Sequence, residues 1–144
     1  MRIALVFCVI SLAACQPVQP DSLTKVDWTN GKQPCLGRNL SFKDGKIAYN
    51  VTDGRIELFD IVSMEAIPSD AELVRVAAAP AAALRKSLDS QGKEWRQEQI
   101  TTFIFRVNDG KLSLAGLQRS GHPNVEKPTA SQSIRFDLRA CPSG

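Results

Sequence analysis

The sequence is short of the residue types from which most catalytic and metal sites are built. It has one histidine, one tyrosine and two tryptophans in 144 residues, and its four cysteines include no Cys-x-x-Cys pair. A single histidine excludes a histidine-rich metal site. No glycine-rich phosphate loop is present either, because each Asp-Gly pair stands where a turn is expected. We therefore expect neither a metal nor a cofactor.

An excess of one charge is also missing. The 18 Lys and Arg residues nearly balance 15 Asp and Glu residues, which gives a net charge of +3. No basic run with interleaved aromatic residues occurs, so a nucleic-acid partner is not expected. The uncharged apolar run of residues 3–14 is much shorter than the roughly 20 residues that a membrane-spanning helix needs.

That short run has the features of a secretory signal peptide. Arg2 supplies the positive charge in front of it, and Ala13 and Ala14 are the small residues that a signal peptidase requires. A buried N-terminal strand or helix is the alternative. It is disfavoured because the run has no amphipathic period and Gln16-Pro17 ends it abruptly.

Leu12-Ala13-Ala14-Cys15 resembles the lipobox of bacterial lipoproteins. The resemblance implies that residues 1–14 are removed and that Cys15 receives a diacylglyceryl group and becomes the acylated N-terminus. Two or more lipid chains hold a protein firmly on a membrane, whereas one does so only marginally. The residue after the cysteine is Gln16 and not Asp, which in the lipoproteins of enteric-type bacteria favours the outer membrane. The implied location is therefore the cell envelope.

The cysteine count then leaves one pair. Cys8 leaves with the signal peptide and Cys15 carries lipid, so Cys35 and Cys141 remain in an oxidising compartment. A disulfide between them is the simplest interpretation, and a redox or metal role is the alternative. Residues 15–27, with Pro17 and Pro20, are expected to form a lipidated tether, followed by one domain over residues 28–144.

Turn signals predict a mainly β domain. Asp44-Gly45, Asp53-Gly54 and Asp109-Gly110 each separate two runs in which alternate residues are apolar, which is a strong hairpin signal. About seven or eight strands follow from such runs. They indicate an antiparallel meander that forms a small barrel or a strongly curved sheet, with a sandwich as the alternative.

Two segments in the middle of the chain need separate interpretation. Residues 72–78 fit both a helix start and a strand, and two β-branched residues favour the strand. Residues 80–91 predict the one helix, with Leu84 and Leu88 one turn apart. We expect these two leucines to pack the helix on the sheet over residues 100–105.

The C-terminal part is expected to hold a long loop and a last strand. Gly116–Lys127 is polar and predicts the longest loop. Residues 133–141 predict the final strand, with Ile134, Phe136 and Leu138 facing inward. The disulfide would tie this strand to the first one, which favours a closed sheet.

Three regions of the mature chain also resemble small secreted β proteins of alphaproteobacteria that are lipocalin-like in outline. The similarity lies in a Val-x-Val strand in residues 73–79, in Gly-Lys-Glu-Trp and Phe-x-x-x-Asp-Gly motifs in residues 92–114, and in a closing strand in residues 134–142 that ends in Cys-Pro. The Gly-x-Trp motif of lipocalins is missing, since Val26-Asp27 precede Trp28. The resemblance therefore implies a fold and no function.

Candidate sites are few. His122 with Ser120 stands in a polar loop, and the carboxylate pairs Glu94 with Glu98 and Glu57 with Asp60 are the remaining options for a hydrolase. With 15 acidic residues, chance neighbours are expected, so we predict no catalytic residues and no enzyme.

The leading hypothesis is a monomeric, non-enzymatic envelope lipoprotein that acts as a binding module at the periplasmic face of the outer membrane. It would recognise a protein partner through loops such as Gly116–Lys127. The alternative is a lipocalin-like carrier of a small apolar molecule, because an eight-stranded barrel is just wide enough to be filled by side chains or to hold one small ligand. Four aromatic residues are candidates for the cavity wall, with ordinary core as the competing interpretation: Trp95, Phe103, Phe105 and Phe136.

Overall fold

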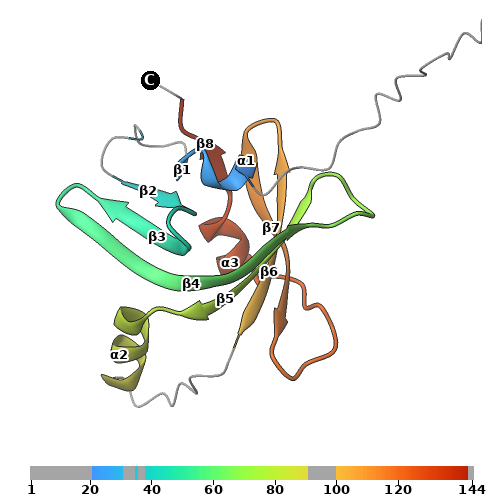
Figure 1. Cartoon of the computed structure of the whole chain (residues 1–144). Helices are drawn as coiled ribbons and strands as arrows, with labels where there is room; N and C mark the ends of the chain where they lie inside the picture. The colour runs from blue at the N-terminus through green and yellow to red at the C-terminus, as the bar shows by residue number, and fades with distance from the viewer. Residues whose placement is uncertain (1–20, 31–34, 36–37, 91–99, 143–144) are drawn as a thin grey trace, which may run out of the picture.

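The computed structural model describes residues 21–30, 35, 38–90 and 100–142, and within them the chain forms a closed antiparallel barrel. Eight strands pair in sequence order, and the last returns to the first (Figure 1). The elements are α1 (Asp21–Thr24), β1 (Trp28–Thr29), β2 (Arg38–Ser41), β3 (Lys46–Val51), β4 (Gly54–Ala66), β5 (Leu73–Pro80), α2 (Ala82–Ser90), β6 (Thr101–Asn108), β7 (Lys111–Arg119), α3 (Ala130–Arg135) and β8 (Leu138–Ala140). The predicted mainly β meander and its closure into a barrel are confirmed.

The Asp-Gly turns explain why neighbouring strands pair. Asp44 and Gly45 both have positive φ between β2 and β3, and Asp109 and Gly110 do so between β6 and β7. A turn with two positive-φ residues matches the right-handed twist of the flanking strands. The hairpins therefore form in the register that the alternating apolar residues require.

The long strand β4 joins the two halves of the barrel. Its first part pairs with β3 and its second part with β5, and the register shifts where Ile47 and Ala48 pair with β4 and between Ile61 and Ser63. Such bulges bend a strand and increase its twist. In Figure 1 β4 runs across the molecule as the green ribbon, which lets one strand take part in both walls.

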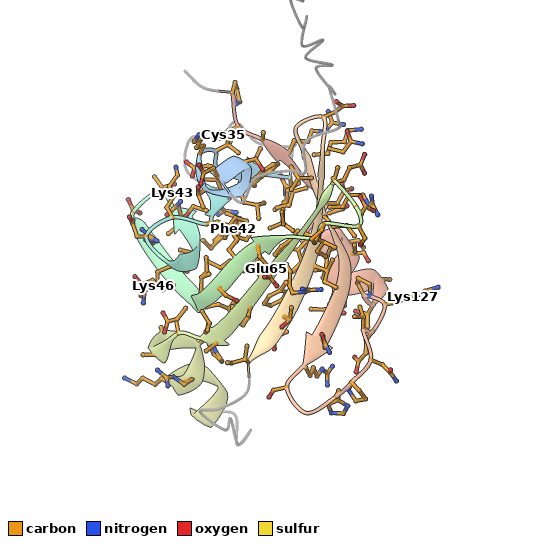
Figure 2. All side chains as sticks on the ribbon, turned by 45° about the vertical axis from the view of Figure 1, so that its right-hand side comes forward. Cys35, Phe42, Lys43, Lys46, Glu65 and Lys127 are labelled. Carbon is orange, nitrogen blue, oxygen red and sulfur yellow. A yellow bond between two sulfur atoms is a disulfide. The ribbon has the colours of Figure 1, made fainter. Side chains whose placement is uncertain are left out.

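The interior of the barrel holds a packed core of large apolar residues. Phe42, which is labelled in Figure 2, and Phe105 are almost fully buried and meet edge to face with ring centroids 5.4 Å apart. Leu23 is also fully buried, and its carbonyl accepts a hydrogen bond from the indole Nε1 of Trp28 at 3.2 Å. The sequence predicted a tether through residue 27, whereas α1 lies in that range and contributes Leu23 to the core.

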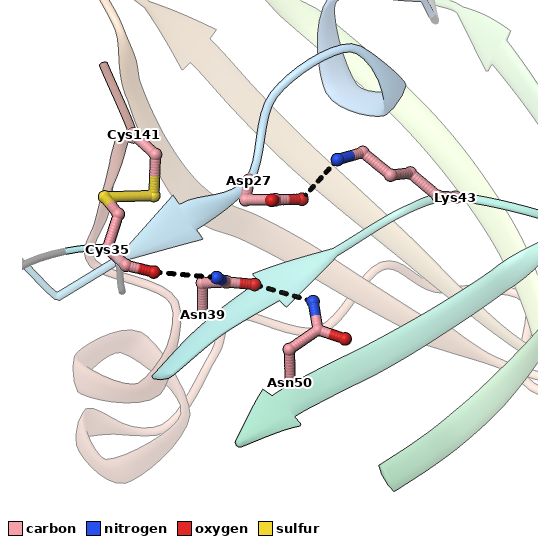
Figure 3. Close-up of a disulfide and its surroundings, with 6 residues drawn as sticks. All are labelled: Asp27, Cys35, Asn39, Lys43, Asn50 and Cys141. Carbon is pink, nitrogen blue, oxygen red and sulfur yellow. Dashed lines mark hydrogen bonds and ion pairs between the residues drawn. A yellow bond between two sulfur atoms is a disulfide. The ribbon is translucent and has the colours of Figure 1, made fainter. Parts of the chain in front are cut away.

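The disulfide predicted from the cysteine count joins Cys35 to Cys141, whose Cα atoms are 5.7 Å apart. It lies beside the junction of β1 with β8, where Trp28 pairs with Ala140. Figure 3 shows the bridge together with the start of β2, which follows Cys35. The first and last strands are therefore joined by backbone pairing, and the disulfide links the segment between β1 and β2 to the residue that follows β8.

The predicted final strand over residues 133–141 is wrong in its first half. Residues 130–135 form α3, and only Leu138–Ala140 are a strand. Thr129 and Gln132 form a capping box, in which each side chain bonds the other residue's backbone N–H. Ile134, which was expected to face inward, is 75% exposed on this helix.

Two more expectations need correction. The strand β7 extends to Arg119, so the polar loop begins after that residue and not at Gly116. The helix α2 forms within residues 80–91 as predicted, but it packs against β4 and not over residues 100–105. Pro80 ends β5, where it pairs with Phe59, and the backbone N–H of Ala81 then donates to the carbonyl of Leu58. This hydrogen bond places the start of α2 on β4.

Candidate ligand-binding cavity

A partly open cavity of about 670 Å³ lies in the barrel, next to the packed core. This volume lies within the range of roughly 300–1,000 Å³ that is typical of small-molecule sites. Strands β1, β2, β3, β4, β6 and β8 contribute to the wall, and α2 and α3 add to it. The lining residues are Trp28, Thr29, Asn30, Arg38, Asn39, Leu40, Tyr49, Leu58, Phe59, Leu84, Phe103, Gln132, Ile134, Arg135, Phe136 and Leu138.

The inner part of the wall is apolar and largely aromatic. Phe103 is 6% exposed and meets Phe59 edge to face, with ring centroids 5.2 Å apart. Phe136, which follows α3, packs against Phe103 from the other side at 6.2 Å. Trp28 presents its ring as apolar surface because its indole N–H is already bonded to Leu23. A ligand in this region would contact rings that the barrel already holds in place.

One polar atom of this inner wall lacks a partner. Tyr49 is half-buried, and its hydroxyl forms no hydrogen bond with the described residues. A buried tyrosine hydroxyl usually finds a partner. The Tyr49 hydroxyl is therefore available to donate to, or accept from, a polar group of a bound molecule.

The β2 side of the cavity is fixed through the disulfide. The Asn39 side-chain amide donates to the backbone carbonyl of Cys35 at 3.0 Å, and its Oδ1 accepts from Asn50 Nδ2 at 2.6 Å (Figure 3). Nearby, Lys43 and Asp27 form an ion pair at 2.6 Å. The bonds of Asn39 connect the start of β2 to β3 and to the bridged cysteine, and they support this side of the cavity.

The charged residues of the wall are two arginines. Arg38 opens β2, Arg135 ends α3, and both are exposed. Neither an aspartate nor a glutamate is among the described lining residues. Four arginines outside the wall form ion pairs, and among them Arg106 donates to Glu72 at 2.6 Å, a bond that raises the pKa of its guanidinium. Arg38 and Arg135 have no such partner among the described residues.

The four aromatic candidates from the sequence have different positions. Phe103 and Phe136 line the cavity. Phe105 is fully buried and contacts Phe136 at 5.4 Å, but it belongs to the packed core and not to the wall. Trp95 lies outside the described residues. Trp28 and Tyr49 are also part of the wall.

Sequence reasoning missed the polar half of the wall. Arg38, Gln132 and Arg135 were not singled out, although a Thr-x-x-Gln capping signal at residues 129–132 was present in the sequence and marks α3. Leu84 of the predicted helix does line the cavity, together with Leu58 of β4. The side chain of Leu88 lies outside the described part of the chain.

Of the hydrolase candidates, the described structure brings together Glu57 and Asp60, which share one lysine. His122 and Ser120 are exposed after β7. Glu57 and Asp60 both pair with Lys46, and the hydrogen bond from Lys46 to Asp60 raises the pKa of the lysine. Glu94 and Glu98 lie outside the described residues. Within the described ranges, no three His, Cys, Asp or Glu side chains gather in a metal-binding cluster.

None of the three helices in the described part of the chain is long and apolar enough to cross a membrane. Comparisons with protein-family models, curated proteins and solved structures gave no match. The closed barrel of eight antiparallel strands is compatible with the lipocalin-like outline expected from the sequence.

Proposed function

We propose that this protein binds a small, largely apolar molecule in the cavity of its barrel. The observation that supports this proposal is the cavity of about 670 Å³, whose inner wall is made of aromatic and aliphatic side chains. Burial of apolar ligand surface contributes roughly 0.8 kcal/mol per methylene group. A protein-recognition module would need only a packed interior and a rigid exposed loop, so the cavity favours the carrier over the protein-binding alternative.

A neutral fluorescent probe tests the proposal directly. N-phenyl-1-naphthylamine, which becomes bright in apolar surroundings, should bind saturably to the mature chain, residues 15–144 with Cys15→Ser, exported to an oxidising compartment. This chain retains every described residue and needs no detergent. Native mass spectrometry of the same material should reveal any co-purified molecule as a non-covalent mass that is lost on denaturation.

Two tryptophan substitutions on the same strand separate the cavity from the outer surface. Leu58 lines the cavity, whereas Val62, also on β4, is 59% exposed and is not part of the wall. Leu58→Trp should fill part of the cavity and weaken probe binding at least about tenfold. Val62→Trp should leave the dissociation constant unchanged. Equal binding by both variants, or no saturable binding by the parent chain, would refute the carrier proposal.

We also propose that the carrier is held in the cell envelope by lipid on Cys15, most favourably at the periplasmic face of the outer membrane. The support is the resemblance of residues 12–15 to a lipobox, which follows an apolar run of signal-peptide length. Radiolabelled palmitate should label the chain, and Cys15→Ser should abolish the label and release the protein from the membrane fraction. Cys8→Ser, in the same run, is the matched control and should keep both. A labelled Cys15→Ser chain would overturn the assignment.

A further inference from the structure

We propose that the ligand of the cavity is an anionic amphiphile, whose apolar chain lies against the aromatic wall and whose acidic headgroup is bound by Arg38 and Arg135. The inference rests on the proposed carrier function and specifies its ligand class. It is drawn from the distribution of charge around the cavity.

The charge of the described wall has one sign. Its two ionised side chains are arginines, and no described lining residue is acidic. Arginine presents several N–H donors in a planar fork that matches a carboxylate or a phosphate, and its guanidinium is only weakly hydrated. A cavity with this composition favours an anionic group over a neutral one and disfavours a cation.

Both guanidinium groups are free to take a ligand. Arg55, Arg75, Arg106 and Arg119 each form an ion pair with a carboxylate of the protein. Among the described residues, neither Arg38 nor Arg135 forms an ion pair or a side-chain hydrogen bond. A bound anion would therefore not have to compete with a protein carboxylate at either position.

The wall is also graded from polar to apolar. Arg38 and Arg135 are exposed, as is Ile134 beside Arg135, whereas Phe103, Trp28 and Leu138 are buried. A charged headgroup can thus remain near solvent, which avoids the cost of burying a charge fully. The apolar chain can lie against the buried side chains, and the hydroxyl of the half-buried Tyr49 is a further polar group of the wall.

The two arginines are supported by different elements. Arg38 is next to Asn39, whose side chain is bonded to Cys35 and to Asn50, so the bridged cysteine holds this end of β2. Arg135 ends α3, which the capping box of Thr129 and Gln132 stabilises. Both guanidinium groups therefore extend from segments that the protein fixes in advance, which reduces the entropy lost on binding.

Three ten-carbon molecules test the headgroup at constant chain length: decanoate, decyl phosphate and 1-decanol. Each is titrated at pH 8 against N-phenyl-1-naphthylamine bound to the chain of residues 15–144 with Cys15→Ser. At least one of the anions should displace the probe at a concentration about tenfold or more below that of 1-decanol, since a hydrogen bond to a charged group is stronger than one to a neutral hydroxyl. The stronger of the two anions identifies a carboxylate or a phosphate headgroup.

Arginine variants then assign the effect. Arg38→Gln and Arg135→Gln should each weaken binding of the preferred anion about fivefold to tenfold, and together they should remove its advantage over 1-decanol. Arg139→Gln on β8 is the matched control, since Arg139 is exposed, lies in no part of the wall and changes the net charge equally. It should leave all three affinities within about twofold.

The possible results are distinguishable. Equal displacement by all three molecules would overturn the headgroup inference and leave the carrier function standing. An advantage of the anions that persists in the double variant would overturn the assignment to Arg38 and Arg135. If the parent chain does not bind the probe at all, the proposed function itself fails. The comparison of ligands on the parent chain does not depend on the folding of any variant.

Discussion

Removal of the disulfide should lower the free energy of unfolding more than any single surface substitution. Cys35 and Cys141 are separated by 106 positions, so the bridge closes most of the domain into one loop. In the chain-entropy description, a loop of this size restricts the unfolded chain by about 4–5 kcal/mol at 25 °C. For a total stability of roughly 5–15 kcal/mol, such a loss leaves a marginal fold.

Urea unfolding of the double variant Cys35→Ala/Cys141→Ala measures this effect. With a slope of about 2 kcal/mol per molar urea, the midpoint should fall by about 2 M relative to the oxidised parent. The parent in dithiothreitol should unfold at the same midpoint as the double variant, which itself should not respond to the reductant. This control separates loss of the bridge from loss of two packed side chains.

The predicted result depends on a bridge that is formed in the purified protein. If the oxidised parent and the double variant unfold within about 0.5 M urea of each other, the loop-closure argument is refuted. A free thiol titration of the parent should give no reactive group at Cys35 or Cys141. Two reactive thiols would show that the cysteines are unpaired.

Three further substitutions test individual parts of the fold. Leu23→Ala should lower the free energy of unfolding in urea by about 2–5 kcal/mol, because this fully buried side chain belongs to the core although it lies in the range expected as a tether. An unchanged free energy of unfolding would mean that α1 is not part of the folded unit. Thr129→Ala should remove the capping box with Gln132 and lower the free energy of unfolding, measured by thermal unfolding, by about 1 kcal/mol. An unchanged stability would show that α3 does not depend on this cap. Gly116→Ala would place a Cβ 2.6 Å from Val125 Cγ1 and should lower the free energy of unfolding by about 1–3 kcal/mol. Adding Val125→Ala to this variant should restore part of the loss, and no recovery would show that this contact is not the cause.

The strands could be predicted because local signals decided them. Turn chemistry at Asp44-Gly45 and Asp109-Gly110 sets hairpins whose register the alternating apolar residues then require. The segment around Val74 and Val76 forms a strand as expected, since both side chains are fully buried in the sheet. In these parts the local sequence and the global fold favour the same structure.

The C-terminal helix could not be derived from alternation. Ile134, Phe136 and Leu138 have the period of a strand, and only a competing signal, the reciprocal bonds of Thr129 and Gln132, stabilises a helix at the same place. The alternation remains true for Phe136 and Leu138, which lie on the cavity wall. Ile134 also lines the cavity, but it differs in burial because its position on α3 leaves it 75% exposed.

The sequence predicts which side chains face the interior of the barrel, but not how far along the barrel axis each of them lies. Phe103 and Phe105 have the same parity on β6 and both face the interior, as the sequence indicated. Whether an inward residue reaches the cavity or the packed core depends on its position along the barrel axis, which parity does not specify. Arg38 and Arg135 are brought into one wall only by closure of the barrel, so no local pattern could have paired them.

The seam of the barrel, where β1 pairs with β8, is short. β1 has two residues and β8 has three, so the junction that closes the sheet contains few backbone pairs. Trp28, Thr29 and Leu138 at this seam all line the cavity, and α3 occupies the chain positions where a longer β8 would have begun. A full final strand would add backbone pairing at the seam, whereas a helix there leaves room inside. The disulfide beside the seam compensates for the missing pairing, which lets the protein keep both a closed sheet and an open interior.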